Sequence, residues 1–165
     1  MTESDARRLL ALGREAELTG AEADAWAGRL RPEREALQAA VTWLAANSEA
    51  GEAVELAVSV WRLWLLEGDV AGGRALLAAA LGADGVPSAA RARALYAAGL
   101  LAFRAGEQEE SRTRNEQALA LARELGDPEA EALALVGLSR VASREGDFVR
   151  VREFAAQAPR ARARL

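Results

Sequence analysis

Four glutamates, Glu107, Glu109, Glu110 and Glu116, form the densest group of residues in this sequence that could do acid-base or metal chemistry. Paired carboxylates can hold a divalent cation or transfer a proton. All four fall in the first half of one predicted helix, where acidic side chains suit the positive end of the helix dipole and the solvent. With no histidine, the sequence lacks the Glu-x-x-His half of a ferritin-like site. We therefore interpret these glutamates as a solvated helix start.

The residue types that are absent exclude several classes of enzyme. The 165 residues include no Cys or His, and all 21 basic residues are Arg. Without thiols and imidazoles there is no disulfide, no Cys or His metal site and no Ser-His or Cys-His nucleophile pair. Without Lys there is no phosphate-loop lysine or Schiff base. We expect no enzymatic activity, no metal and no cofactor.

Two other groups of residues could bind a ligand, but each has a structural interpretation that fits better. Gly68, Gly72 and Gly73 with Arg74 could form an anion-binding helix start. Their spacing fits a helix C-cap followed by a close helix crossing. The four Trp residues could line a pocket, yet they fall where aromatic side chains pack between helices.

The elements that position these residues are predicted to be helices throughout. With 41 Ala and only four Pro, the sequence is rich in helix formers, and apolar residues recur at helical spacing between the turns. A capping box is predicted at Thr19 and Glu22, and Asp127 before Pro128 should cap a later helix. The predicted helices span residues 4–18, 21–30, 33–47, 52–67, 69–82, 88–105, 107–125, 129–145 and 147–157.

Three tight junctions indicate an internal repeat. Gly68-Asp69, Gly106-Glu107 and Gly146-Asp147 lie 38 and 40 residues apart, and each joins two predicted helices as an antiparallel hairpin. Aligned on these glycines, the residues expected to meet where the paired helices cross are Trp61 with Gly73, Gly99 with Ser111, and Ser139 with Val151. At least one member of each pair is small, which favours a repeated packing unit.

The repeat resembles known helical families. The segment from Leu95 through Gly99, Ala102 and Gly106 to Ala118 resembles a tetratricopeptide repeat, although Asn115 stands where that family has an aromatic residue. Residues 21–158 also resemble the helical-repeat region of large bacterial nucleotide-binding transcriptional regulators of the LuxR-type, antibiotic-regulatory class. The motifs that carry this second likeness are Trp26-x-x-x-Leu30-x-x-Glu33-x-x-x-Leu37-x-Ala39-Ala40-x-x-Trp43-Leu44, Trp61-x-x-Trp64-x-x-x-Gly68-x-x-x-x-x-Arg74 and residues 118–127.

The resemblance implies a scaffold and no chemistry. It implies an all-α, tetratricopeptide-like right-handed superhelix of antiparallel hairpins in a single domain, residues 1–165, with capping helices at 1–48 and hairpins at 52–82, 88–125 and 129–158. In those regulators the ATPase and DNA-binding activities belong to separate domains. This sequence has neither a G-x-x-x-x-G-K-[ST] loop nor a basic recognition helix.

Solenoids bind their partners on the concave surface, so the residues aligned to that surface are the candidate ligand contacts. They are Glu55, Ser59, Arg62, Arg93, Tyr96, Phe103, Arg104, Arg140 and Arg144. Five arginines against one acid predict a positive groove in a chain whose net charge is −4. The alternative interpretation is a set of arginines that merely solvate helix surfaces.

The sequence therefore predicts a protein or peptide interaction module in bacterial regulation, with an acidic partner. The alternative is a small-molecule effector-sensing domain. We expect a cytoplasmic protein with no direct nucleic-acid or membrane binding, since there is no strongly basic region, leader-like segment or long apolar run. The final helix keeps Phe148, Val151, Phe154 and Ala155, which predicts a homodimer through this end or a following repeat.

Overall fold

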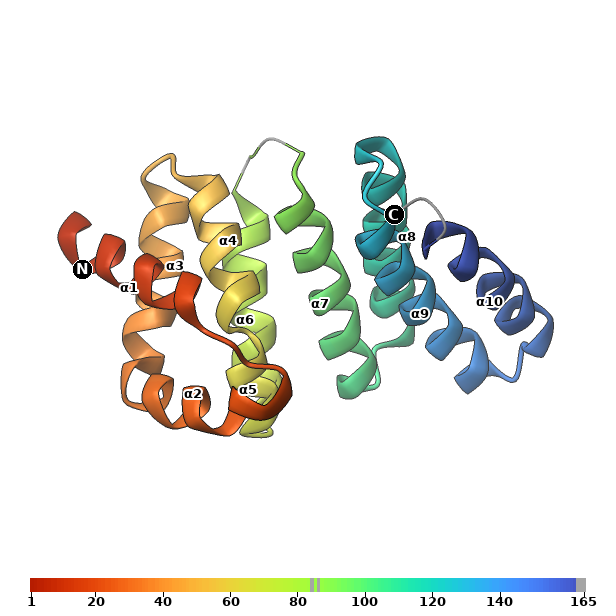
Figure 1. The fold of residues 1–165 in the computed structure, drawn as a ribbon, viewed down its shortest axis with the longest axis horizontal. Helices are drawn as coiled ribbons and strands as arrows, with labels where there is room; N and C mark the ends of the chain where they lie inside the picture. The colour runs from red at the N-terminus through yellow and green to blue at the C-terminus, as the bar shows by residue number, and fades with distance from the viewer. Residues whose placement is uncertain (84, 86, 163–165) are drawn as a thin grey trace. The chain divides into compact units, whose positions relative to one another are not determined.

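Every described segment of regular secondary structure is helical, so the all-α prediction is confirmed. The computed structural model describes residues 1–83, 85 and 87–162, and within these it describes side chains as far as residue 157. The α-helices are α1 (Glu3–Glu15), α2 (Ala23–Leu30), α3 (Arg34–Ala46), α4 (Ala50–Val60), α5 (Arg62–Leu66), α6 (Val70–Gly82), α7 (Ala89–Ala105), α8 (Gln108–Leu125), α9 (Pro128–Glu145) and α10 (Phe148–Arg162). Two short 3-10 helices, η1 (Gly20–Glu22) and η2 (Arg31–Glu33), flank α2 (Figure 1).

The helices pack into two compact units. Unit 1 comprises residues 1–86 and contains α1 to α6, and unit 2 comprises residues 87–165 and contains α7 to α10. The predicted single-domain organisation over residues 1–165 stays a prediction.

One predicted helix is interrupted. The sequence predicts a continuous helix over 52–67, whereas α4 ends at Val60 and α5 begins at Arg62. At the break the amide of Trp64 donates to the carbonyl of Trp61 at 3.2 Å, which is the tighter i to i+3 bond of a 3-10 turn. Both tryptophans are buried there, as expected for core residues.

The capping box predicted at Thr19 and Glu22 is wrong. Thr19 precedes η1 and its side chain makes no capping hydrogen bond, because α1 ends at Glu15 and the chain continues in extended conformation. A capping box forms instead at the start of α1, where Thr2 accepts from the amide of Asp5 and the Asp5 carboxylate accepts from the amide of Thr2.

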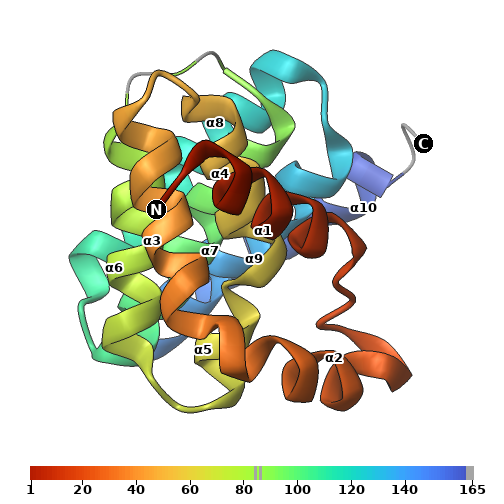
Figure 2. The ribbon, with the colours of Figure 1, turned by 90° about the vertical axis from the view of Figure 1, so that its left-hand side faces the viewer.

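In unit 1, α1 lies across α3 and α4 (Figure 2). Gly13 lets α1 pack closely on the side chain of Leu56 in α4, because a Cβ at that position would lie 2.6 Å from Leu56 Cδ1. Arg14 reinforces the contact through two hydrogen bonds to the carboxylate of Glu55, each 2.9 Å long. The face of α4 that the repeat alignment assigns to the concave surface is therefore packed beneath α1.

In unit 2, α7 to α10 form two consecutive antiparallel hairpins, and α8 packs against both α7 and α9 (Figure 1). The helix ends follow the sequence signals. Gly106 and Gly146 end α7 and α9 with φ values of 86° and 76°, a left-handed conformation that favours glycine. Asp127 caps α9 by accepting from the amides of Glu129 and Ala130.

The centre of unit 2 is built around a buried amide. Asn115 of α8 is 1% exposed, and its side chain lies between Gly99 of α7 and Gly137 of α9. A Cβ added at either glycine would fall well inside van der Waals contact with that amide. The repeat alignment predicts Ser111 opposite Gly99, but the atoms nearest to Gly99 belong to Asn115, which lies one turn further along α8. The Asn115 amide fills the space between α7 and α9, so both neighbouring helices need glycine at this point.

Candidate functional site

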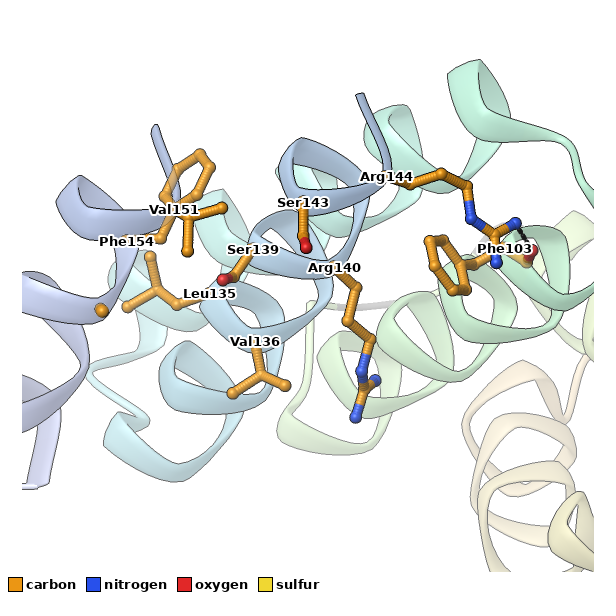
Figure 3. Close-up of a pocket in the computed structure, with 10 residues that line it drawn as sticks. Phe103, Leu135, Val136, Ser139, Arg140, Ser143, Arg144, Val151 and Phe154 are labelled. Atoms are coloured by element: carbon orange, nitrogen blue, oxygen red, sulfur yellow. Dashed lines mark hydrogen bonds between the residues drawn. The ribbon is translucent and has the colours of Figure 1, made fainter. Parts of the chain in front are cut away.

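A groove of about 850 Å³ runs along the surface of α9 in unit 2 (Figure 3). Its walls come from the C-terminal part of α7, the outward side of α9 and one side of α10. The lining residues are Phe103, Leu135, Val136, Ser139, Arg140, Ser143, Arg144, Val151, Phe154 and Ala155. Leu135, Val151 and Phe154 gather at one end, whereas Arg144 and Phe103 lie together at the other. The groove therefore combines an apolar part with a cationic part.

The two arginines that line the groove donate only to neutral oxygens among the described residues. Arg140 Nη1 donates to the hydroxyl of Tyr96 at 3.2 Å. Arg144 Nη1 donates to the backbone carbonyl of Phe103 at 3.2 Å, and its guanidinium carbon lies 3.8 Å from the centroid of the Phe103 ring. Because Arg140 and Arg144 are four residues apart, both reach the same side of α9. Neither positive charge has a described carboxylate partner.

Other arginines of unit 2 are neutralised within the chain. Arg93 lies 3.0 Å from a carboxylate oxygen of Glu129, and Arg123 lies 3.0 Å from one of Glu131. Arg112 is paired with Glu145, and that hydrogen bond is the main cause that raises the pKa of the guanidinium above its ordinary value. Arg140 and Arg144 differ from these paired arginines, so positive charge in the groove remains available to a ligand.

Of the nine residues predicted to contact a ligand, three lie in unit 1. Glu55 is bound to Arg14, whose hydrogen bonds hold the pKa of the Glu55 carboxyl below its ordinary value. The hydroxyl of Ser59 donates to the carbonyl of Glu55 at 3.0 Å, close to where α1 crosses α4. The guanidinium carbon of Arg62 lies 4.8 Å from the centroid of the Trp61 ring. The structure thus uses Glu55 and Ser59 in packing α1.

The other six predicted residues lie in unit 2, and the structure brings four of them together. Phe103, Arg140 and Arg144 line the groove, and Tyr96 is bound to Arg140. Arg93 is instead paired with Glu129. Arg104 is exposed at the end of α7 and does not line the groove.

The other candidate sites are occupied by structural contacts. Glu109 and Glu110 pair with arginines on their own helix, at 3.6 Å and 4.0 Å. Within the part of the chain that the structure describes, no cluster of acidic residues could hold a metal ion. At the start of α6, the Asp69 carboxylate accepts from the amide of Gly72 at 2.8 Å, so the helix N-terminus is capped by the chain itself.

The alignment to a concave surface missed most of the apolar part of the groove. Leu135, Val136, Ser139 and Ser143 of α9 were not among the predicted contacts. The other wall is the apolar side of the final helix, which the sequence indicates as a contact surface, and Val151, Phe154 and Ala155 all line the groove. Phe148 lies beside them on α10 and is 64% exposed.

The fold places the chain in the class of all-α proteins. No protein-family model and no curated protein matches the sequence. The crystal structure of BtubC (BKLC) from P. vanneervenii is similar, with a TM-score of 0.68 and 21% sequence identity over 98% of this chain and 72% of that chain. At this identity the similarity concerns the fold alone. None of the described helices combines the length and apolar character needed to cross a lipid bilayer.

Proposed function

We propose that this protein is a non-catalytic interaction scaffold, and that the groove along α9 binds an acidic segment of a partner protein. The observation that carries the proposal is the pair Arg140 and Arg144, which line an apolar groove and donate to neutral oxygens only, among the described residues. A guanidinium binds a carboxylate through two parallel hydrogen bonds, so a Glu or Asp side chain or a chain terminus fits this pair.

The apolar part of the groove is needed for useful affinity. An exposed ion pair contributes only about 0 to 1 kcal/mol, so two of them would give a weak complex. Burial of apolar surface adds roughly 25 cal/mol per Å², and Val136, Val151 and Phe154 offer such surface in the same groove as the charges. We therefore expect binding that weakens with salt and does not vanish.

The broader setting of the proposal follows from the resemblance found in the sequence. We place the chain among tetratricopeptide-like superhelical scaffolds of bacterial regulation, working in the cytoplasm. Small residues at the helix crossings support a tetratricopeptide-like packing, since Gly99 of α7 and Gly137 of α9 both lie against α8.

The alternative function is the sensing of a small-molecule effector. It would draw support from a deep pocket lined by Trp64, Tyr96 and Phe103. Trp64 is fully buried within unit 1, and Tyr96 is 7% exposed. Of the three, Phe103 alone lines the groove. The geometry favours an elongated peptide over a compact effector.

The test uses fluorescence anisotropy with two peptide libraries, one rich in Glu and Asp and the other with Gln and Asn in their place. We expect the acidic library to bind about tenfold more tightly at low salt, as two surface ion pairs allow. The double variant Arg140→Gln with Arg144→Gln should remove that difference while far-UV circular dichroism stays unchanged.

Arg104→Gln is the matched control, because Arg104 is an exposed arginine of the same unit that does not line the groove. It should leave the preference for acidic peptides intact. Equal binding of the two libraries by the native protein would contradict the proposal, and so would an equal effect of Arg104→Gln.

A further inference from the structure

The groove on α9 and α10 is equivalent to the surface of α7 and α8 on which α9 packs. Aligned on Gly106 and Gly146, the hairpin of α9 and α10 repeats that of α7 and α8 with an offset of 40 residues. On the first hairpin, formed by α7 and α8, the next helix α9 packs against both members. Gly137 of α9 lies over Asn115, and Arg140 bonds to Tyr96. We call the surface of a hairpin that the following helix covers its seat. The first seat lies on α7 and α8, and the second seat is the groove on α9 and α10. A helix therefore fits the second seat.

The groove is lined by the equivalents of the residues that α9 covers. Val136 and Ser143 stand at the positions of Tyr96 and Phe103, and Ala155 stands at the position of Asn115. Tyr96 and Asn115 are 7% and 1% exposed, whereas Val136 is 42% exposed. Ala155 is also exposed. The second seat is thus formed by equivalent positions of the hairpin, with different side chains and without a described helix in it.

The replacement of asparagine by alanine changes which residue the seat can accept. Asn115 carries three heavy atoms beyond Cβ, and they lie where a Cβ on Gly137 would have to be. Ala155 carries none, so the second seat is deeper at this point. A helix placed there needs no glycine and has room for a large apolar side chain against Val151 and Phe154.

The rim of the second seat also differs in charge. Arg140 and Arg144 stand at the positions of Leu100 and Arg104, so two cationic groups border the seat where the first hairpin has one. Since neither has a described carboxylate partner, a helix that carries acids on this side would complement them.

From these two differences we propose that the groove binds an amphipathic helix of a partner protein. The helix places a large apolar residue over Ala155 and acidic residues next to Arg140 and Arg144. It occupies on α9 and α10 the seat that α9 itself occupies on α7 and α8, which is a helix-in-groove mode of recognition. The inference rests on the proposed function and specifies the conformation and side chains of the ligand.

The probe is a synthetic peptide with the sequence of α9, Pro128–Glu145, carrying Gly137→Leu, Arg140→Glu and Arg144→Glu. A side-chain lactam on its outer face keeps it helical, because an isolated peptide of this length is only marginally helical in water. Binding to the full chain is measured by fluorescence anisotropy. A second peptide retains Gly137 and is otherwise identical.

We expect the leucine peptide to bind the native protein about tenfold more tightly than the glycine peptide, since it buries one more apolar side chain. In the variant Ala155→Asn the leucine peptide should lose that advantage, because the new amide fills the depth of the seat as Asn115 does in the first hairpin. Ala156→Asn is the matched control, an exposed alanine of α10 that does not line the groove, and it should preserve the ranking.

Three results would overturn the helix proposal. The first is an equal response of the two peptides to Ala155→Asn, and the second is an equal effect of Ala156→Asn. The third is a concentration-dependent dimer in sedimentation that Ala155→Asn abolishes, because a second copy of the chain would then occupy the seat. If acidic peptides still bind through Arg140 and Arg144 while the leucine and glycine peptides do not differ, the proposed function survives and the helical ligand fails.

Discussion

The glycine at the crossing of α8 and α9 gives the sharpest test of the packing in unit 2. In Gly137→Ala the added methyl group would overlap the side-chain amide of Asn115. That amide cannot move aside, because Gly99 lies on its other side and its Nδ2 donates to the carbonyl of Ser111 at 2.8 Å. Overpacking of this kind costs about 1 to 3 kcal/mol, while alanine is favoured over glycine in a helix by about 1 kcal/mol. We expect a net loss of about 1 kcal/mol in the free energy of unfolding.

The effect of Gly137→Ala on the free energy of unfolding should change sign when the Asn115 amide is removed. In an Asn115→Ala background, Gly137→Ala should stabilise the protein by up to about 1 kcal/mol, so that the coupling between the two sites is about 2 kcal/mol. Denaturation in guanidinium chloride, followed by circular dichroism at 222 nm, measures these values if the m-value stays constant.

The control is Gly28→Ala, at an exposed helical glycine whose added Cβ would have no neighbour within 4 Å. It should stabilise by up to about 1 kcal/mol in any background. If Gly137→Ala stabilises the native sequence as Gly28→Ala does, Asn115 does not lie at this crossing.

Three further predictions concern the helix ends and the packing of α1. Gly106→Ala should destabilise by about 1 kcal/mol and Gly106→Asn by less, measured by the same denaturation, because φ is 86° at this position. Gly13→Val should detach α1 from α4 by collision with Leu56, seen as faster amide exchange in α1 with α8 unchanged. Hydrogen bonds from Arg14 and Arg8 hold the pKa of Glu55 and Glu33 below the ordinary 4.5. The two carboxylates therefore stabilise the folded state fully above pH 4.5, and this stabilisation is lost as the pH falls through their lowered pKa. Acid titration of α1 exchange should therefore show loosening below about pH 4.5, and Glu55→Gln should make that pH dependence shallower.

The sequence by itself determined the helices and most of the turns, because these depend on chemistry within a few residues. Glycine followed by an acid marks a left-handed helix end and the start of the next helix, and this held at Gly106 and Gly146. Asp127 before Pro128 likewise gave the cap of α9. The helix predicted over 52–67 is interrupted at Trp61, and the local pattern gave no sign of this break.

The tertiary structure alone decided which charges remain available to a ligand. Arginines are spread along the whole sequence, and a helical pattern cannot tell a paired guanidinium from an unpaired one. The pairs that neutralise Arg93 and Arg112 join residues 36 and 33 positions apart, so they form only once α7, α8 and α9 are placed against each other. The same placement sets Arg140 and Arg144 beside neutral oxygens. It also sets α1 over Glu55, because the fit of Gly13 against Leu56 is a property of two surfaces that are distant in sequence.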